Sequence, residues 1–163
     1  MKAITLYNPH AVLMASFEKR IETRPRRWKY CGPVAIHSGL SGACDYLSDE
    51  EPFKSVLAKC GYPHWSCMPF GCVLAVGQMI GSVESEYLQT VETEERPRAY
   101  TNGGMLDIPY HFTAQEQAFG NYNPGRFCYI FSSMRRLREP IPAKGHQGIW
   151  EWEPPANLEE LYV

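Results

Sequence analysis

Alternating apolar and polar positions predict a chain built mainly from short β-strands. This two-residue period, in which successive side chains point to opposite faces, recurs in several separate stretches. The alternating stretches are residues 2–7, 20–24 and 34–37, and residues 127–131 and 149–152 are two further predicted strands. Residues 72–80 are apolar at nearly every position, which predicts a strand buried on both faces. Pro140 and Pro142 lack a backbone N–H, so regular pairing is predicted to stop before them.

Helical signals are fewer and shorter than strand signals. The predicted helices are residues 9–18, capped by Asn8; a segment ending at Lys59, capped by Ser48; and a segment ending at Phe119, capped by Thr113. Glu116 stands three residues after Thr113, which is the spacing of a capping box. The Pro-rich tail, residues 154–163, is expected to be a surface extension.

The length and composition fit one folded domain. The 163 residues are enough for a hydrophobic core, and neither repeats nor linkers divide the chain. Together with the strand pattern, this predicts a single α+β domain over residues 1–163, a small, mostly β barrel with a few short peripheral helices. No apolar run is long enough to cross a membrane, and no signal-peptide core precedes Asn8-Pro9, so we expect a cytoplasmic protein without a membrane partner.

The six cysteines are expected to be reduced thiols in that compartment. Four soft ligands, Cys60, His64, Cys67 and Cys72, lie within thirteen residues and raise the question of zinc. The paired Cys-x-x-Cys spacing of zinc ribbons is missing, and Cys72 begins an apolar strand in which a thiol packs as a small hydrophobe. We predict no metal and no other cofactor, and zinc on these four side chains remains the alternative.

The charges are distributed unevenly, although the net charge is only −2. One basic block comprises Lys19, Arg20, Arg24, Arg26, Arg27 and Lys29. A second comprises Arg135, Arg136 and Arg138. A local basic face can bind phosphate groups even when the total charge is negative. For the second block, a solvated edge strand is the favoured interpretation.

Several ordered blocks of sequence can be grouped: residues 4–11, 19–24 and 30–37 near the N-terminus, and residues 119–127, 136–137, 140–142 and 145–150 in the last third of the chain. Together these blocks resemble the ASCH domain family. The family signature is Gly-x-Lys-x-x-Glu-x-Arg. Lys19, Glu22 and Arg24 match it, whereas Phe17 occupies the glycine position. The resemblance spans the chain except for insertions at about 40–68 and 84–112.

The resemblance implies a PUA-like β-barrel that binds RNA or a nucleotide-like ligand. In that family the signature lines a cleft between the first helix and the adjacent strands. The strand parity of this chain agrees, because Arg20, Glu22 and Arg24 are predicted to share one strand face. Lys19 has the opposite parity, and we therefore place it in the preceding turn, where charges of both signs should lie at a surface or a wet cleft.

The first functional hypothesis is therefore an RNA- or nucleotide-binding module, with DNA as a further ligand. Arginine forks suit phosphates, aromatic rings stack on bases, and polar side chains read base edges. The predicted phosphate contacts are Arg24, Arg26 and Arg27; the stacking candidates are Trp28, Tyr30 and Tyr122; the base-reading candidates are Asn8 and Glu22. Core packing is an equally weighted interpretation of Trp28.

The alternative is a metal-independent hydrolase. Some small ASCH-like proteins are amidohydrolases that deacylate N4-acetylcytidine, and the resemblance implies a lysine beside a threonine nucleophile. Lys19 matches that lysine, but Glu22 occupies the threonine position, so Glu22 would activate water while Lys19 stabilises the oxyanion. A ribonuclease would use the same pair with His10 or His37 as proton carrier. A plain ion pair between Lys19 and Glu22 is the non-catalytic interpretation.

Overall fold

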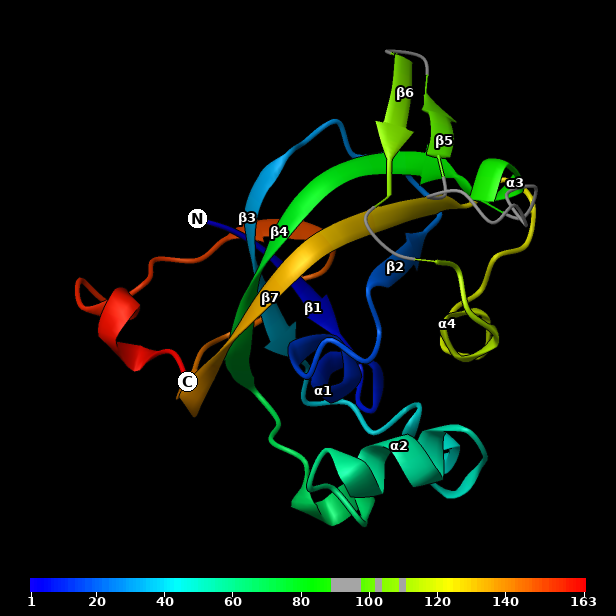
Figure 1. Ribbon diagram of the computed structural model, residues 1–163. Helices are drawn as coiled ribbons and strands as arrows, with labels where there is room; N and C mark the ends of the chain where they lie inside the picture. The colour runs from blue at the N-terminus through cyan, green and yellow to red at the C-terminus, as the bar shows by residue number, and fades with distance from the viewer. Residues whose placement is uncertain (89–97, 102–103, 109–110) are drawn as a thin grey trace. The chain divides into compact units, whose positions relative to one another are not determined.

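The computed structural model describes residues 1–88, 98–101, 104–108 and 111–163. Six strands form one curled, half-barrel mixed sheet in the order β2-β7-β4-β3-β1-β8, and β5 and β6 form a separate two-stranded sheet (Figure 1). The strands are β1 (Lys2–Leu6), β2 (Ile21–Arg24), β3 (Gly32–Ser38), β4 (Cys72–Glu84), β5 (Arg98–Thr101), β6 (Gly104–Asp107), β7 (Phe127–Pro142) and β8 (Ile149–Glu151).

The helices are short and few. The α-helices are α1 (His10–Ala15), α2 (Phe53–Lys59), α3 (Ser85–Leu88) and α4 (Ala114–Ala118); the 3-10 helices are Asp45–Asp49, Trp65–Cys67 and Leu158–Leu161. The predicted fold class, α+β and mostly β, is confirmed. No helix among the described residues is long and apolar enough to cross a membrane.

The chain forms two compact units. The first unit comprises Met1–Lys19, Pro33–Gly77 and Ser133–Val163, and the second comprises Arg20–Gly32 and Gln78–Ser132. The long strands β4 and β7 contribute residues to both units. Each unit has its own hydrophobic core, described below. The insertion predicted at 84–112 falls in the second unit, and part of it lies outside the described residues.

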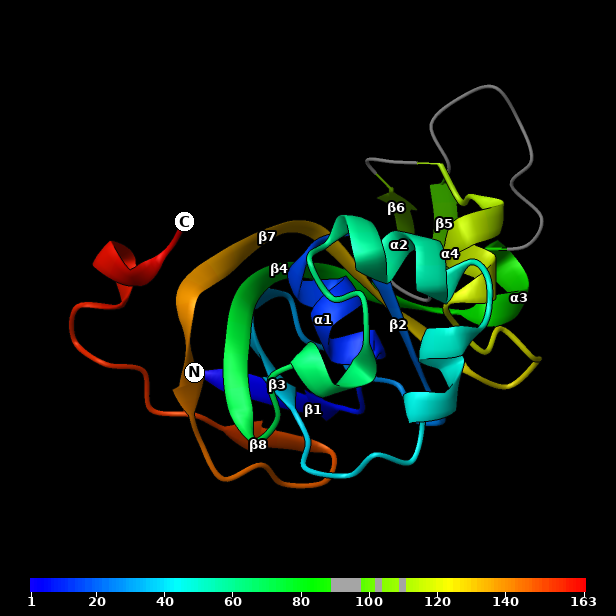
Figure 2. The ribbon, with the colours of Figure 1, turned by 90° about the horizontal axis from the view of Figure 1, so that it is seen from below.

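In the first unit, β1 pairs in parallel with β3 and antiparallel with β8. Helix α1 contacts β1, as Figure 2 shows. The core of this unit gathers Ala3, Ala35, Val73, Val76, Leu137, Trp152, Leu158 and Tyr162. Leu158 and Tyr162 belong to the tail, where only 8% of each is exposed. The expected surface extension is therefore wrong, because apolar tail side chains complete this core.

In the second unit, β2 pairs antiparallel with the beginning of β7. Ile21 lies opposite Ile130 and Thr23 opposite Cys128, and Ile21, Cys128 and Ile130 share the core of this unit. The rest of this core comprises Val83, Leu88, Ile108 and Tyr122. Glu22 and Arg24 therefore lie on the other face of β2, as the alternation predicted.

The first two predicted helices begin later than expected. Pro9 occupies the N-cap of α1 without a side-chain capping hydrogen bond, so the predicted cap at Asn8 is wrong. Asn8 instead donates from Nδ2 to the Pro69 carbonyl at 2.8 Å. Helix α2 begins at Phe53, after Pro52, and not beside Ser48. The third cap is confirmed, because Thr113 Oγ1 accepts from the backbone N–H of Glu116 at 3.1 Å.

Strand β7 passes the prolines that were predicted to end regular structure, since it runs to Pro142. One side of β7 neighbours β4, and β2 pairs with the other side only over residues 127–130. Beyond that point, the described residues pair with the second side of β7 through an isolated bridge between Leu137 and Tyr162, and the rest of this side is a sheet edge among the described residues. Pro140 and Pro142 have the same parity, and an edge tolerates their missing N–H groups because no neighbouring strand needs those donors.

Candidate functional site

Strand β2 presents two of the signature residues side by side. Glu22 and Arg24 share one face, and Arg24 Nε lies 2.9 Å from Glu22 Oε1. Their cross-strand partners on β7 are Tyr129 and Phe127. The side chains of Arg24 and Glu22 are 26% and 12% exposed, so the pair is partly screened from water and still reachable.

Two aromatic residues follow β2, Trp28 and Tyr30, and Trp28 contacts Tyr129 of β7; we call these three residues the aromatic group. The rings of Trp28 and Tyr30 are stacked, with centroids 4.7 Å apart and an interplanar angle of 13°. Trp28 also contacts Tyr129 at 5.7 Å and 57°. The hydroxyl of Tyr129 donates to the Arg26 carbonyl at 2.7 Å, which attaches the segment after β2 to β7.

Sequence reasoning missed Tyr129, although it predicted the strand that carries it. The pairing register places Tyr129 opposite Glu22, and this register could not be inferred from a two-residue period. Burial raises the pKa of the Tyr129 hydroxyl; the nearby Arg24 guanidinium lowers it, and Glu22 raises it. The hydroxyl therefore stays protonated and donates its hydrogen bond at ordinary pH.

A glycine allows Tyr30 to fold onto Trp28. Gly32 has φ 145°, a backbone conformation that residues with a side chain rarely adopt. A Cβ atom at this position would lie 2.7 Å from Tyr30 Oη and 2.9 Å from its Cζ. Any side chain at position 32 would thus displace the tyrosine ring.

Basic side chains surround the aromatic group in sequence. Arg26 and Lys29 are exposed and Arg27 is half-buried. Within the described part of the chain, none of the ion pairs involves these three residues. A planar stacking group with neighbouring cations is the combination that binds single-stranded nucleic acid or nucleotides.

A buried carboxylate anchors the start of β2. Glu116 is only 4% exposed, and its Oε2 and Oε1 accept from the backbone N–H groups of Arg20 at 2.8 Å and Ile21 at 3.1 Å. The hydroxyl of Tyr122 donates to the same Oε1 at 3.4 Å. The capping-box pattern identified Glu116 but assigned it a local role in α4. Its side chain instead fixes the strand that carries the signature residues.

Tyr122, predicted to stack on a base, lies within the core of the second unit. It is 5% exposed and contacts Phe112 edge-on, with ring centroids 4.8 Å apart. The structure thus places Tyr122 among Ile21 and its apolar neighbours, and not in the aromatic group.

The remaining predicted site residues belong to the first unit. Lys19 is 1% exposed, so the expectation that it lines a surface or wet cleft is wrong. Asn8 is also fully buried. His10 begins α1 and packs edge-on against Phe53 at 5.6 Å. The catalytic pairing of Lys19 with Glu22 stays a prediction.

His37 occupies a closed environment in β3. It is 1% exposed, and its Nε2–H donates to the Ala143 carbonyl at 3.0 Å. Its ring meets Trp150 edge-on at 5.5 Å, and Gly145 lies so close that an added Cβ would clash with the imidazole. Burial lowers the pKa of His37; the bond to Ala143 raises it and the nearby His146 lowers it. The proton-carrier role also stays a prediction.

The glycine position of the signature has the backbone of a glycine. Phe17 has φ 59°, in the left-handed region that is uncommon for other residues and unusual for a bulky one. Lys19 follows two residues later, and β2 begins at Ile21. The turn between α1 and β2 therefore has the geometry that a glycine would favour.

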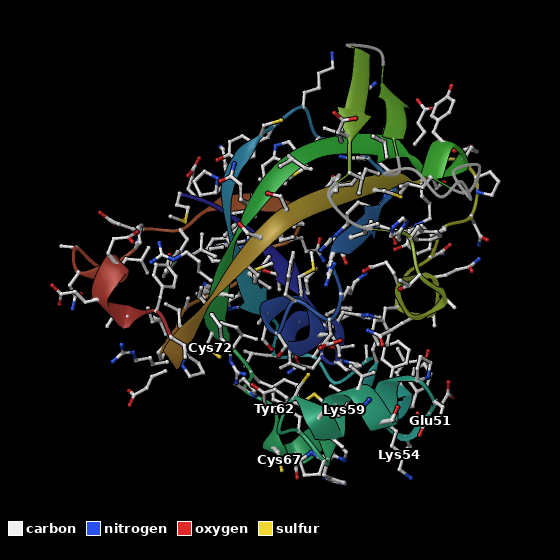
Figure 3. All side chains as sticks on the ribbon, in the orientation of Figure 1. Glu51, Lys54, Lys59, Tyr62, Cys67 and Cys72 are labelled. Carbon is white, nitrogen blue, oxygen red and sulfur yellow. The ribbon has the colours of Figure 1, made fainter. Side chains whose placement is uncertain are left out.

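The four soft ligands do not gather into a metal site. Among the described residues, no group of three or more His, Cys, Asp or Glu side chains is placed to hold a metal ion. Figure 3 labels Cys67 on the 3-10 helix Trp65–Cys67 and Cys72 at the start of β4, which are different elements. His64 Nδ1 lies 2.8 Å from Ser66 Oγ, and burial raises the thiol pKa values of Cys60 and Cys72.

Comparison with known proteins adds no identification. No model of a known protein family matches the chain, and a search of curated proteins gives no match. The function must therefore be inferred from the contacts of the site itself.

Proposed function

We propose that this protein is an RNA- or nucleotide-binding module whose ligand places a base against Trp28. The aromatic group on a basic segment carries this proposal: Trp28 is stacked with Tyr30 at 4.7 Å, and Arg26 and Lys29 are exposed beside it in sequence. Aromatic side chains stack on any base face, while arginine and lysine neutralise the phosphates between bases.

The Glu22–Arg24 pair supplies the polar part of the proposed site. A carboxylate accepts hydrogen bonds from exocyclic amines of bases, and a guanidinium donates to base acceptors or phosphate. Both side chains lie on one face of β2, and both act on Tyr129, which contacts Trp28. The polar pair and the aromatic group are therefore neighbours and can contact one ligand.

The backbone at Phe17 supports the ASCH-like part of this proposal. The signature has glycine where this chain has Phe17, and the φ of 59° is one that glycine adopts at little cost. The signature strand thus begins after a turn of the kind the family motif implies, although the side chain differs. We include membership of the ASCH and PUA-like class in the proposal on this basis.

Isothermal titration with oligo-adenylate RNA, single-stranded oligo-deoxyadenylate and an RNA duplex tests the proposal. Trp28→Ala should weaken single-strand binding by about 1–3 kcal/mol, roughly fivefold to more than a hundredfold, because a stacking partner is lost. Trp65→Ala is the matched control, since Trp65 is 42% exposed in the first unit. Equal effects of the two variants, or no binding by the wild-type protein, would contradict the proposal.

A further inference from the structure

We propose that Tyr30 occupies the position of a base on Trp28 in the free protein, and that an unpaired base displaces it. This inference rests on the proposed function and adds how the same site is regulated and which ligands it admits. The Tyr30 and Trp28 rings are nearly parallel, 13° apart with centroids at 4.7 Å. Bases stack on aromatic side chains in the same parallel manner, so the tyrosine and a base compete for one face of the indole.

The two tyrosines beside Trp28 are held differently. Tyr129 is 4% exposed, lies in the paired part of β7, and donates its hydroxyl hydrogen to Arg26. Moving it would disrupt the sheet and the attachment of the basic segment. Tyr30 is half-buried and lies between β2 and β3, outside any strand or helix. Tyr30 is therefore the ring that can leave Trp28 without breaking strand pairing.

The backbone after Tyr30 is adapted to this placement. Gly32 leaves room for the tyrosine hydroxyl, which a Cβ atom would approach to 2.7 Å. With φ 145°, Gly32 also has conformational freedom that other residues lack. The turn at Gly32 therefore permits the stacked position of Tyr30.

Displacement determines which ligands the site accepts. A base must replace the tyrosine–tryptophan contact, so only bases with a free face can bind, and large purine faces compete best. A duplex offers no free base face along its length, which makes single-stranded, purine-containing RNA or a purine nucleotide the expected ligand class. Binding is then weaker than the bare stacking contact would allow, because breaking the aromatic pair opposes it.

Titration of four variants with oligo-adenylate RNA tests this competition, because each variant should raise, lower or preserve the binding affinity in a different way. Tyr30→Ala should bind about threefold to tenfold more tightly than the wild type, since it removes the internal competitor. Tyr30→Phe keeps the competing ring and should therefore not show the gain in affinity expected of Tyr30→Ala. Trp28→Ala should bind more weakly, and Tyr46→Ala, an exposed tyrosine of the first unit, should not change the affinity. Thermal melting of each variant confirms that it is folded.

The outcomes separate this inference from the proposed function. If Tyr30→Ala weakens binding or leaves it unchanged while Trp28→Ala weakens it, Tyr30 is not a competitor: the displacement inference is overturned and the proposed function stands. If Trp28→Ala binds as tightly as the wild type, the proposed function fails first. Proton NMR gives a second test, because the Tyr30 ring resonances should lose their ring-current shift when oligo-adenylate saturates the protein. Retention of that shift would overturn the inference.

Discussion

Two basic clusters in this chain look alike in sequence and differ in their contacts. The first cluster is Arg24, Arg26, Arg27 and Lys29, and the second is Arg135, Arg136 and Arg138. In the second, Arg135 Nη1 lies 2.7 Å from Glu159 Oε2, and its guanidinium covers the Tyr162 ring at 3.7 Å. Arg136 donates to the Tyr62 hydroxyl at 2.7 Å and Arg138 to the Tyr162 carbonyl at 2.9 Å.

The difference between the clusters is whether the chain supplies partners for the cations. Every arginine of the second cluster has one, and these partners come from residues 24 or 74 positions away. In the first cluster, Arg24 alone has a carboxylate partner among the described residues, and this partner, Glu22, lies two residues away in the same strand. We infer that the first cluster is organised for an external ligand, whereas the second attaches the C-terminal segment to β7.

The largest expected effect concerns two carboxylates: Glu116, which holds the start of the strand that carries Arg24, and Glu159, which pairs with Arg135. Glu116→Ala should destabilise the protein by about 2–4 kcal/mol, because two backbone N–H groups at the start of β2 lose their acceptor. Glu159→Ala should cost about 0.5 kcal/mol or less, since that side chain is 77% exposed. Urea unfolding of both variants measures the contrast. Equal destabilisation by the two substitutions would contradict the expected difference between the buried and the exposed carboxylate.

The next effect concerns affinity. Arg26→Ala should weaken oligo-adenylate binding about fivefold to tenfold and reduce the slope of log affinity against log salt by about 0.7, because one phosphate contact is lost. Arg135→Ala should leave both quantities nearly unchanged. Titrations at several salt concentrations measure the two slopes. An equal loss in Arg135→Ala would show that the second cluster also contacts the ligand.

The smallest effect is a pH dependence in the unit that holds the second cluster. Strand β7 is followed by Ala143, which accepts from His37, and burial lowers the pKa of His37 from 6.5. Below pH 6.5 the unfolded chain therefore binds a proton at His37 more readily than the folded protein does. The contribution of the neutral, buried His37 to stability is complete above pH 6.5 and decreases as the pH falls towards the folded pKa. We therefore expect the free energy of unfolding to decrease as the pH falls below 6.5.

The contacts of the His37 imidazole explain why a lower pH should decrease the stability. Among the described residues, Nδ1 of His37 has no hydrogen-bond partner, and the nearby titratable group is His146, which opposes a second positive charge. Protonation would create a buried donor without an acceptor. Thermal melting of wild type and His37→Gln across this pH range is the measurement. A slope that persists in His37→Gln would assign the acid sensitivity to other groups.

Local patterns predicted the parts of the site that depend on neighbouring residues. Strand parity placed Glu22 and Arg24 on one face, and the Thr113 cap follows from a threonine and a glutamate three positions apart. Tyr129 and Glu116 needed information that no local pattern contains, because a strand register and a contact 95 residues apart bring them to β2. The tail was misjudged for the same reason, since its apolar residues complete a core whose other members are distant in sequence.

The close approach of Gly32 to Tyr30 has an evolutionary consequence. A chain with a large ring at position 30 must keep glycine at position 32, because a Cβ atom there would lie 2.7 Å from the tyrosine oxygen. A chain that loses the ring is relieved of the steric part of this requirement. The residues at positions 30 and 32 should therefore covary among related sequences. If glycine persists at position 32 irrespective of the residue at position 30, the backbone conformation alone explains why it is retained.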